Sequence, residues 1–307
     1  MGLTKPVPRG PEGKADGGGG LAAGTPAPRR RLEAYALLLL LLGSFTLAYW
    51  PTLEGLVGAW SNSDDYSHGF IILPLSVFIA WQKRDLIAGL QPNPSRWGLV
   101  LVAAALLLYL VGRLGEITTL AAVSMVPALA GVILYLRGCA FLGALIFPLF
   151  LTFFMIPVPA QIYSLATIPL QLWVSQVSAG LAGLLNIPVY REGNVLFLPH
   201  RTLEVVQACS GLRSMMALLA LSVVFGYLTL KSNALRTLLA ISAVPASILV
   251  NIIRVLVLIL CEYYFSYDLS TGALHTVFGV FIFAQALALI ALAKGILSFW
   301  DQSAVSK

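Results

Sequence analysis

The sequence predicts an all-α polytopic membrane protein with about eight transmembrane helices, an interfacial helix and a short β-hairpin on the outer face. Two observations carry this prediction. Hydrophobic residues make up 59% of the 307 residues and charged residues only 10%, whereas soluble domains contain about 25% charged residues. Several apolar runs also approach the roughly 20 residues that an α-helix needs to cross a bilayer.

The net charge of +6 does not by itself indicate a partner. Basic residues that flank transmembrane spans normally set the orientation of a membrane protein. The sequence has no basic stripe interleaved with aromatic residues, so we expect no nucleic-acid partner. We expect no cofactor and no metal ion either.

The N-terminal region differs in composition from the rest of the chain. Residues 1–31 contain Gly17–Gly20 and end in Arg29–Arg31, which predicts a disordered, basic, Gly/Pro-rich cytoplasmic tail. We expect residues 32–298 to form the transmembrane domain and residues 299–307 to form a C-terminal cytoplasmic tail.

The first apolar run, Leu32 to Trp50, follows a basic region, as the apolar part of a signal peptide does. The residues Tyr49-Trp50-Pro51 are bulky and offer no small-residue cleavage site. We therefore interpret this run as an uncleaved first span.

Apolar runs and the charges between them divide the chain into expected spans. These lie near residues 33–50, 68–82, 97–112, 117–136, 139–156, 211–230, 236–260 and 275–297. The positive-inside rule places Arg29–Arg31, Lys83-Arg84, Arg137, Lys231 and Lys294 on the cytoplasmic side. Both termini are then cytoplasmic.

Residues 161–187 are apolar but contain Gln161, Gln171, Gln176 and Pro169. If this segment crossed the membrane, the loops after it could not keep the sides given above. We therefore expect a half-buried interfacial or re-entrant helix on the outer side.

A short extramembrane insert follows this helix. The β-prone runs Asn194–Leu198 and Thr202–Val206 flank Pro199-His200-Arg201, which predicts a β-hairpin. This hairpin would lead the chain to Cys209 from the aqueous side.

Three polar residues are expected at one depth on the outer face. Cys209 lies at the outer start of the sixth span, and His275 opens the eighth span from outside. Arg254 is about 27 Å along the seventh span from Arg236, which puts it near the outer surface.

Each of these residues suits one task in acyl transfer. Cys209 precedes Ser210 at a helix start, where free amides and the helix dipole favour the reactive thiolate. His275 can exchange a proton near neutral pH. Arg254 can hold an oxyanion, and Asn251 lies one turn away on the same face, where it can orient the guanidinium.

Simpler interpretations of the same residues remain open. A free cysteine in a membrane helix is usually a small apolar residue, as we expect for Cys139. Arg254 could extend from a helix end to water, and His275 alone could be an ordinary interfacial residue. A disulfide between Cys209 and Cys261 would make the thiol structural, and labelling of free thiols would reveal it.

A second outer cluster precedes a short apolar run of about 14 residues. That run spans roughly 21 Å, less than a bilayer core of about 30 Å. Asp64, Asp65 and His68 could therefore lie below the surface, where Asp65 or His68 would bind substrate or orient His275. The alternative is a solvated cap on a tilted helix.

At these residues the chain resembles the exosortase/archaeosortase family. The resemblance covers roughly residues 33–297. Four blocks carry it, and their order on a polytopic frame is specific: Asp65-Tyr66-Ser67-His68-Gly69-Phe70; Ala208-Cys209-Ser210-Gly211 with Ser214; Asn251-Ile252-Ile253-Arg254-Val255; and His275 with Gly279. One small departure is Gln207, where an acidic residue is common in the family.

The resemblance implies a membrane-embedded cysteine transpeptidase of the bacterial inner membrane. Such enzymes act on exported, membrane-anchored proteins with a C-terminal sorting signal, which consists of a motif such as Pro-Glu-Pro (PEP-CTERM), a transmembrane helix and a basic cluster. They cut near the motif on the outer face and transfer the protein to an acceptor, which the sequence does not identify. Bacterial members often accompany exopolysaccharide genes. By this resemblance, Cys209 is expected to be the nucleophile, Arg254 the transition-state stabiliser and His275 the general acid/base.

Two other classes of protein are compatible with the composition. In a polytopic transporter or channel, Asn251 and Arg254 would line a substrate path. The sequence lacks paired broken helices in two related halves, and its polar groups gather at one surface instead of the midplane. A non-catalytic membrane component of exopolysaccharide export would tolerate the loss of Cys209.

Overall fold

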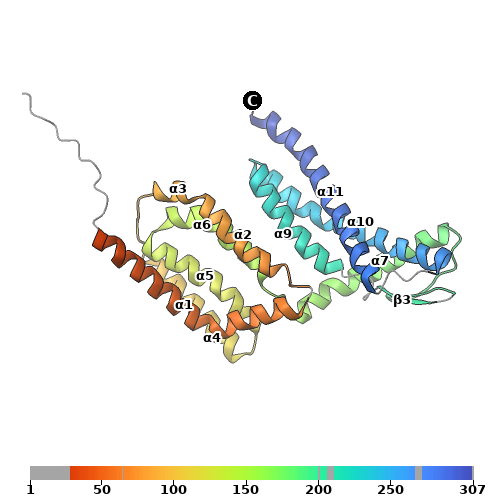
Figure 1. The fold of residues 1–307 in the computed structure, drawn as a ribbon, viewed down its shortest axis with the longest axis horizontal. Coiled ribbons are helices and arrows are strands. Elements are labelled where there is room, and N and C mark those ends of the chain that lie inside the picture. The colour runs from red at the N-terminus through yellow and green to blue at the C-terminus, as the bar shows by residue number, and fades with distance from the viewer. Residues whose placement is uncertain (1–27, 64, 200, 206–210, 267–271, 306–307) are drawn as a thin grey trace, which may run out of the picture. The chain divides into compact units, whose positions relative to one another are not determined.

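The computed structural model describes residues 28–63, 65–199, 201–205, 211–266 and 272–305 (Figure 1). Its secondary structure is almost entirely helical. The helices are α1 (Pro28–Asn62), α2 (Gly69–Gln82), α3 (Arg84–Ala88), α4 (Trp97–Leu114), α5 (Thr118–Leu136), α6 (Cys139–Leu151), the 3-10 helix η1 (Thr152–Met155), α7 (Ala160–Leu184), α9 (Gly211–Thr229), α10 (Asn233–Phe265) and α11 (Gly272–Val305). The predicted all-α membrane fold is confirmed.

The chain divides into two compact units, Met1–Ala48 and Tyr49–Lys307. In the first unit the structure describes the first part of α1, where Leu37, Leu39 and Leu40 are at least 60% exposed. Exposed leucines on a helix are suited to contact with lipid chains. The second unit holds all the other helices and the sheet.

Four helices in the described part of the chain are long and apolar enough to cross a membrane. They are α4, α5, α10 and residues 277–301 of α11. The pair Cys139–Met155 and Ala160–Leu184 passes the same test only together, which raises the number to five. Helices occupy all eight of the expected segments, but α2 and residues 215–229 of α9 are shorter than a full span. A count of eight crossings stays a prediction.

Helices α4 and α5 form a tight antiparallel pair because glycines line their contact. Gly98 faces the backbone of Gly131 and Tyr135 near one end of the pair. At the other end, a Cβ atom on Gly112 would lie 2.6 Å from the amide nitrogen of Ala121. Small residues allow such close backbone approach between membrane helices.

Helix α7 turns by 78° from the line of α6 and η1. The turn occupies residues 156–159, which include Pro157 and Pro159. This bend agrees with the predicted interfacial or re-entrant helix at 161–187, and it also fits one broken span. Pro169 lies inside α7 without ending it.

The predicted hairpin is confirmed, and it has an additional strand. Strands β1 (Tyr190–Glu192), β2 (Val195–Phe197) and β3 (Thr202–Glu204) form an antiparallel sheet in the order β1-β2-β3. Gly193, at φ +62°, supplies the left-handed residue in the turn from β1 to β2.

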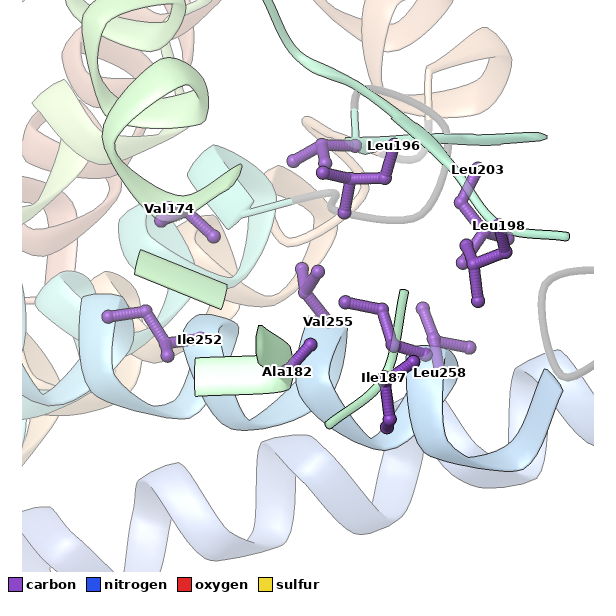
Figure 2. Close-up of a cluster of buried hydrophobic side chains, with 11 residues drawn as sticks. Val174, Ala182, Ile187, Leu196, Leu198, Leu203, Ile252, Val255 and Leu258 are labelled. Atoms are coloured by element: carbon purple, nitrogen blue, oxygen red, sulfur yellow. The ribbon is translucent and has the colours of Figure 1, made fainter. Parts of the chain in front are cut away.

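This sheet packs over α7 and the second half of α10. Leu196, Leu198 and Leu203 of the hairpin meet Val255 and Leu258 of α10 in one buried cluster (Figure 2). Val174 and Ala182 of α7 and Ile187, just beyond it, complete the contact. The cluster therefore fixes the hairpin against the part of α10 that carries the candidate site.

Helices α9, α10 and α11 pack against one another around a second buried core. That core includes Leu218 of α9, Leu239 and Ala243 of α10, and Ile282 and Ile290 of α11. The turn between α9 and α10 is held from α11: the Asp301 carboxylate accepts hydrogen bonds from the amides of Lys231, at 2.7 Å, and Ser232, at 3.1 Å. Helix α11 continues to Val305, beyond the expected domain boundary at residue 298.

Candidate active site

Helix α10 buries two polar side chains that the sequence singled out. Asn251 is 7% exposed and Arg254 is 5% exposed. With Ser247 they lie at spacings of four and three residues, so all three share one helix face. A buried guanidinium is costly unless other groups compensate its charge. The face is therefore more than a solvated surface.

This polar face of α10 points toward α11. A hollow of about 10 Å³ lies between them, lined by Asn251, Arg254 and Ser247 on α10 and by Ile282 and Phe283 on α11. A space of this size holds about one water molecule. A larger group could therefore enter this hollow only after a shift of side chains.

The start of α9 lies about level with this polar face. The α9 residue Gly226 faces Arg236 at the start of α10, and the two helices run in opposite directions from the turn at Asp301. Gly211, which opens α9, is fifteen residues before Gly226. At about 1.5 Å per residue, the same rise along α10 leads from Arg236 to Asn251.

Cys209 and Ser210 directly precede Gly211, but both lie outside the described residues. The level of Gly211 is in keeping with the prediction that Cys209 is near Arg254, because only one residue separates Cys209 from the helix start. The distance between the sulfur and the guanidinium stays a prediction.

The backbone of His275 lies in α11, whereas its side chain is outside the part that the structure describes. His275, Gly279 and Ile282 share one helix face by their spacing, and Ile282 lines the hollow beside Arg254. His275 is about 10 Å nearer the start of α11 than Ile282. It therefore belongs to the face that meets α10, and its level relative to Arg254 stays a prediction.

The second outer cluster, which precedes α2, makes contacts of a different kind. Its His68 Nε2 lies 3.0 Å from the carbonyl oxygen of Phe154, and the hydroxyl of Tyr163 donates to Asp65 Oδ2 at 3.1 Å. Asp64 lies outside the described residues. These two partners belong to η1 and to α7.

Further hydrogen bonds hold the same connection. The indole of Trp60 donates to the carbonyl oxygen of Met155 at 2.8 Å, and the hydroxyls of Tyr66 and Thr119 donate to Val158 at 3.3 Å and Pro157 at 2.9 Å. Burial raises the pKa of Tyr66, and the Asp65 charge raises it further, although the Val158 bond opposes both. Tyr66 therefore stays a neutral donor at physiological pH.

Gly69 is required by this arrangement for a steric reason. A Cβ atom at Gly69 would overlap the Trp60 ring around Nε1. The absence of a side chain therefore allows Trp60 to lie against the start of α2 while it reaches Met155. This explains one glycine of the block Asp65–Phe70 by packing.

The sequence reasoning missed an ion pair between the hairpin and α10. Arg201 Nη1, between β2 and β3, lies 3.9 Å from Glu262 Oε2. Glu262 is eight residues after Arg254, so the two are on the same face of α10. This spacing marks the helix face of Glu262, but nothing in the sequence marks Arg201 as its partner.

Larger hollows lie elsewhere in the described part of the second unit, and two of them adjoin α4 and α5. One, of about 790 Å³, has mostly apolar walls from α4, α5, α6, α9 and α10. The other, of about 490 Å³, lies where α4 and α5 join, beside α1. Neither is lined by Asn251 or Arg254. Cys261 and Cys139 are free thiols, so in the structure Cys261 carries no disulfide.

Comparisons with known proteins identify the family. Searches of curated proteins and of solved structures give no match. A family model described as transmembrane exosortase matches residues 60–292. The matched range includes Cys209, Arg254 and His275 and spans well over half of the 307 residues. The chain is a multi-pass membrane protein that belongs to the transmembrane exosortase family.

Proposed function

We propose that the protein is a membrane-embedded cysteine transpeptidase. It cleaves the C-terminal sorting signal of exported, membrane-anchored proteins on the outer face of the inner membrane and transfers them to an acceptor. Cys209 is the nucleophile, Arg254 stabilises the transition state and His275 is the general acid/base. Asn251 orients Arg254, and Ser210 belongs to the same helix start.

The observation that carries the proposal is the family match over residues 60–292. It is supported by the burial of Asn251 and Arg254 on the face of α10 that meets α11. It is supported also by the start of α9 at about the level of Asn251. A cysteine just before a helix start has its thiolate favoured by the free amides there.

The first chemical step breaks the peptide bond of the substrate. The Cys209 thiolate attacks the scissile carbonyl carbon, and the oxygen gains a negative charge, which Arg254 stabilises. The intermediate then collapses: the C–N bond breaks, the leaving amine takes a proton from the His275 imidazolium, and the acyl group stays on sulfur as a thioester.

The second step transfers the acyl group. The acceptor, an amine or another nucleophile, attacks the thioester carbonyl while neutral His275 takes its proton. The C–S bond breaks and the Cys209 thiolate is restored. No oxidant, reductant or cofactor is consumed, because one acyl bond is exchanged for another.

Membrane anchoring of the substrate lowers the barrier to this reaction. A substrate held by its own transmembrane helix is already confined to the bilayer plane, and its scissile bond lies at a fixed depth. Because the substrate is already confined, less entropy is lost when it meets the enzyme than in an encounter of two freely diffusing molecules.

The chain offers matched controls for a test of the nucleophile. Cys209→Ala should leave a co-expressed candidate substrate uncleaved in membranes, whereas Cys139→Ala and Cys261→Ala should process it normally. In wild-type membranes a substrate–enzyme adduct should form that hydroxylamine releases, as expected of a thioester. Normal processing by Cys209→Ala would refute the proposal and favour a transporter or a non-catalytic component.

A further inference from the structure

The hollow of about 490 Å³ is lined by both apolar and polar residues, none of which has a role in the proposed catalytic function. It lies between the second half of α1, the joined ends of α4 and α5, and Pro157. Its inner wall is formed by small residues, including Gly55, Ala59, Gly112 and Ala121. Because Gly112 brings α4 and α5 together at this end, the space beside α1 is left unfilled.

A buried hydroxyl lines this hollow without a partner. Thr52 is 8% exposed, and its Oγ1 has no hydrogen-bond partner among the described residues. Buried polar atoms in proteins are nearly always satisfied, by protein, water or ligand. The hydroxyl is therefore free to bond to water or to a polar group of a ligand inside the hollow.

Two opposite charges line the same hollow. Arg113 lies in the last turn of α4, and Glu116 lies in the connection to α5 at φ +55°. Both are exposed, and they make no ion pair with each other. A guanidinium binds a phosphate through parallel hydrogen bonds, and a carboxylate accepts hydrogen bonds from an ammonium group.

The hollow also lies where a membrane surface is expected. Helices α4 and α5 are both long and apolar enough to cross the bilayer, and the hollow includes their joined ends at Gly112 and Thr118. The residues that line it are thus at the level of lipid headgroups, with the apolar spans on one side. Lipid is the most abundant ligand at this depth.

We propose that this hollow binds the phosphoethanolamine headgroup of a membrane phospholipid. Arg113 holds the phosphate, Glu116 holds the primary ammonium, and the Thr52 hydroxyl donates to an oxygen near the glycerol. An anionic headgroup without an amine would bring like charge toward Glu116. A choline headgroup has no N–H to donate. The site therefore selects among lipids by the ammonium group.

The test uses the full-length protein in nanodiscs made from phosphatidylcholine, into which phosphatidylethanolamine or phosphatidylglycerol is titrated. Bound lipid is measured by native mass spectrometry after release. The wild type should retain phosphatidylethanolamine. Arg113→Gln and Glu116→Gln should each reduce its retention by at least about tenfold, because each removes a charge-assisted hydrogen bond.

Three substitutions refine the test. Arg137→Gln, at the other end of α5, and Glu54→Gln, on α1 near Thr52, do not line the hollow and should retain the lipid. Thr52→Val keeps the side-chain shape and should weaken retention less than the loss of either charge. Thermal unfolding in detergent identifies any variant that fails to fold.

Either of two results would overturn the proposal. One is equal retention of phosphatidylglycerol and phosphatidylethanolamine by the wild type. The other is undiminished retention in a folded Glu116→Gln protein. Substrate processing is measured in parallel, so a failure of this proposal is distinguishable from a failure of the transpeptidase proposal.

Discussion

Substitution of Arg254 tests the role of the buried guanidinium most directly. Arg254 is 5% exposed, and the hollow beside it has about 10 Å³. Only about one water fits there, so water cannot substitute well for a missing donor. Removal of one donor to a developing oxyanion costs about 10² to 10³ in rate. We therefore expect Arg254→Gln to slow substrate processing by about 10² or more.

Arg254→Lys separates charge from geometry. Lysine keeps the positive charge but loses the planar fork of donors, so it cannot offer an oxyanion two parallel hydrogen bonds. We expect its processing rate to stay well below that of the wild type, although above that of Arg254→Gln. The control is Arg236→Gln at the start of the same helix, which should process substrate normally.

The assay is a pulse-chase of a co-expressed, tagged substrate in membranes, with the cleaved fraction followed over time. The amount of each variant in the membrane is measured by immunoblot and its folding by size exclusion in detergent. Processing at the wild-type rate by a folded Arg254→Lys protein would refute the assignment of Arg254 as an oxyanion donor.

Two other predictions concern packing and the helix turn. Gly69→Ala should displace the Trp60 ring, break its bond to Met155 and lower stability by about 1–3 kcal/mol, whereas Gly58→Ala, with open space around it, should not. Asp301→Ala leaves the Lys231 and Ser232 amides without their acceptor and should cost about 2–4 kcal/mol; the matched control is the exposed Asp85→Ala. Thermal unfolding midpoints in detergent measure both, and an unchanged midpoint for Gly69→Ala or Asp301→Ala would contradict the packing described.

The helices were predictable because their signal is strong and local. Long apolar runs separated by basic residues predicted the segments that form α4, α5, α10 and α11, because a helix that crosses a bilayer needs a long apolar run. The ends were less predictable: α10 begins at Asn233 and ends at Phe265, against the expected 236–260. Helices can extend past the apolar core into water, where hydropathy no longer marks them.

Contacts between residues far apart in the sequence could not be predicted from the hydrophobic pattern. Strand β1 was missed because Tyr190–Glu192 contains the charged residues Arg191 and Glu192 instead of a β-prone run, and it becomes a strand only by pairing with β2. The ion pair of Arg201 with Glu262 depends on how the hairpin packs over α10. Neither contact leaves a periodic trace in the sequence, because each joins residues from separate elements.

The residues that carry the family resemblance divide into two structural groups. Asn251 and Arg254 lie buried on the face of α10 toward α11. The backbone of His275 lies in α11. Asp65, Tyr66 and His68 instead make their described contacts with residues 154–163. That connection makes the 78° turn into α7, and α7 packs on α10 through the cluster of Figure 2. The described contacts of the block before α2 therefore reach the helix that carries Asn251 and Arg254 through α7, so we expect substitutions in this block to disturb the placement of α7.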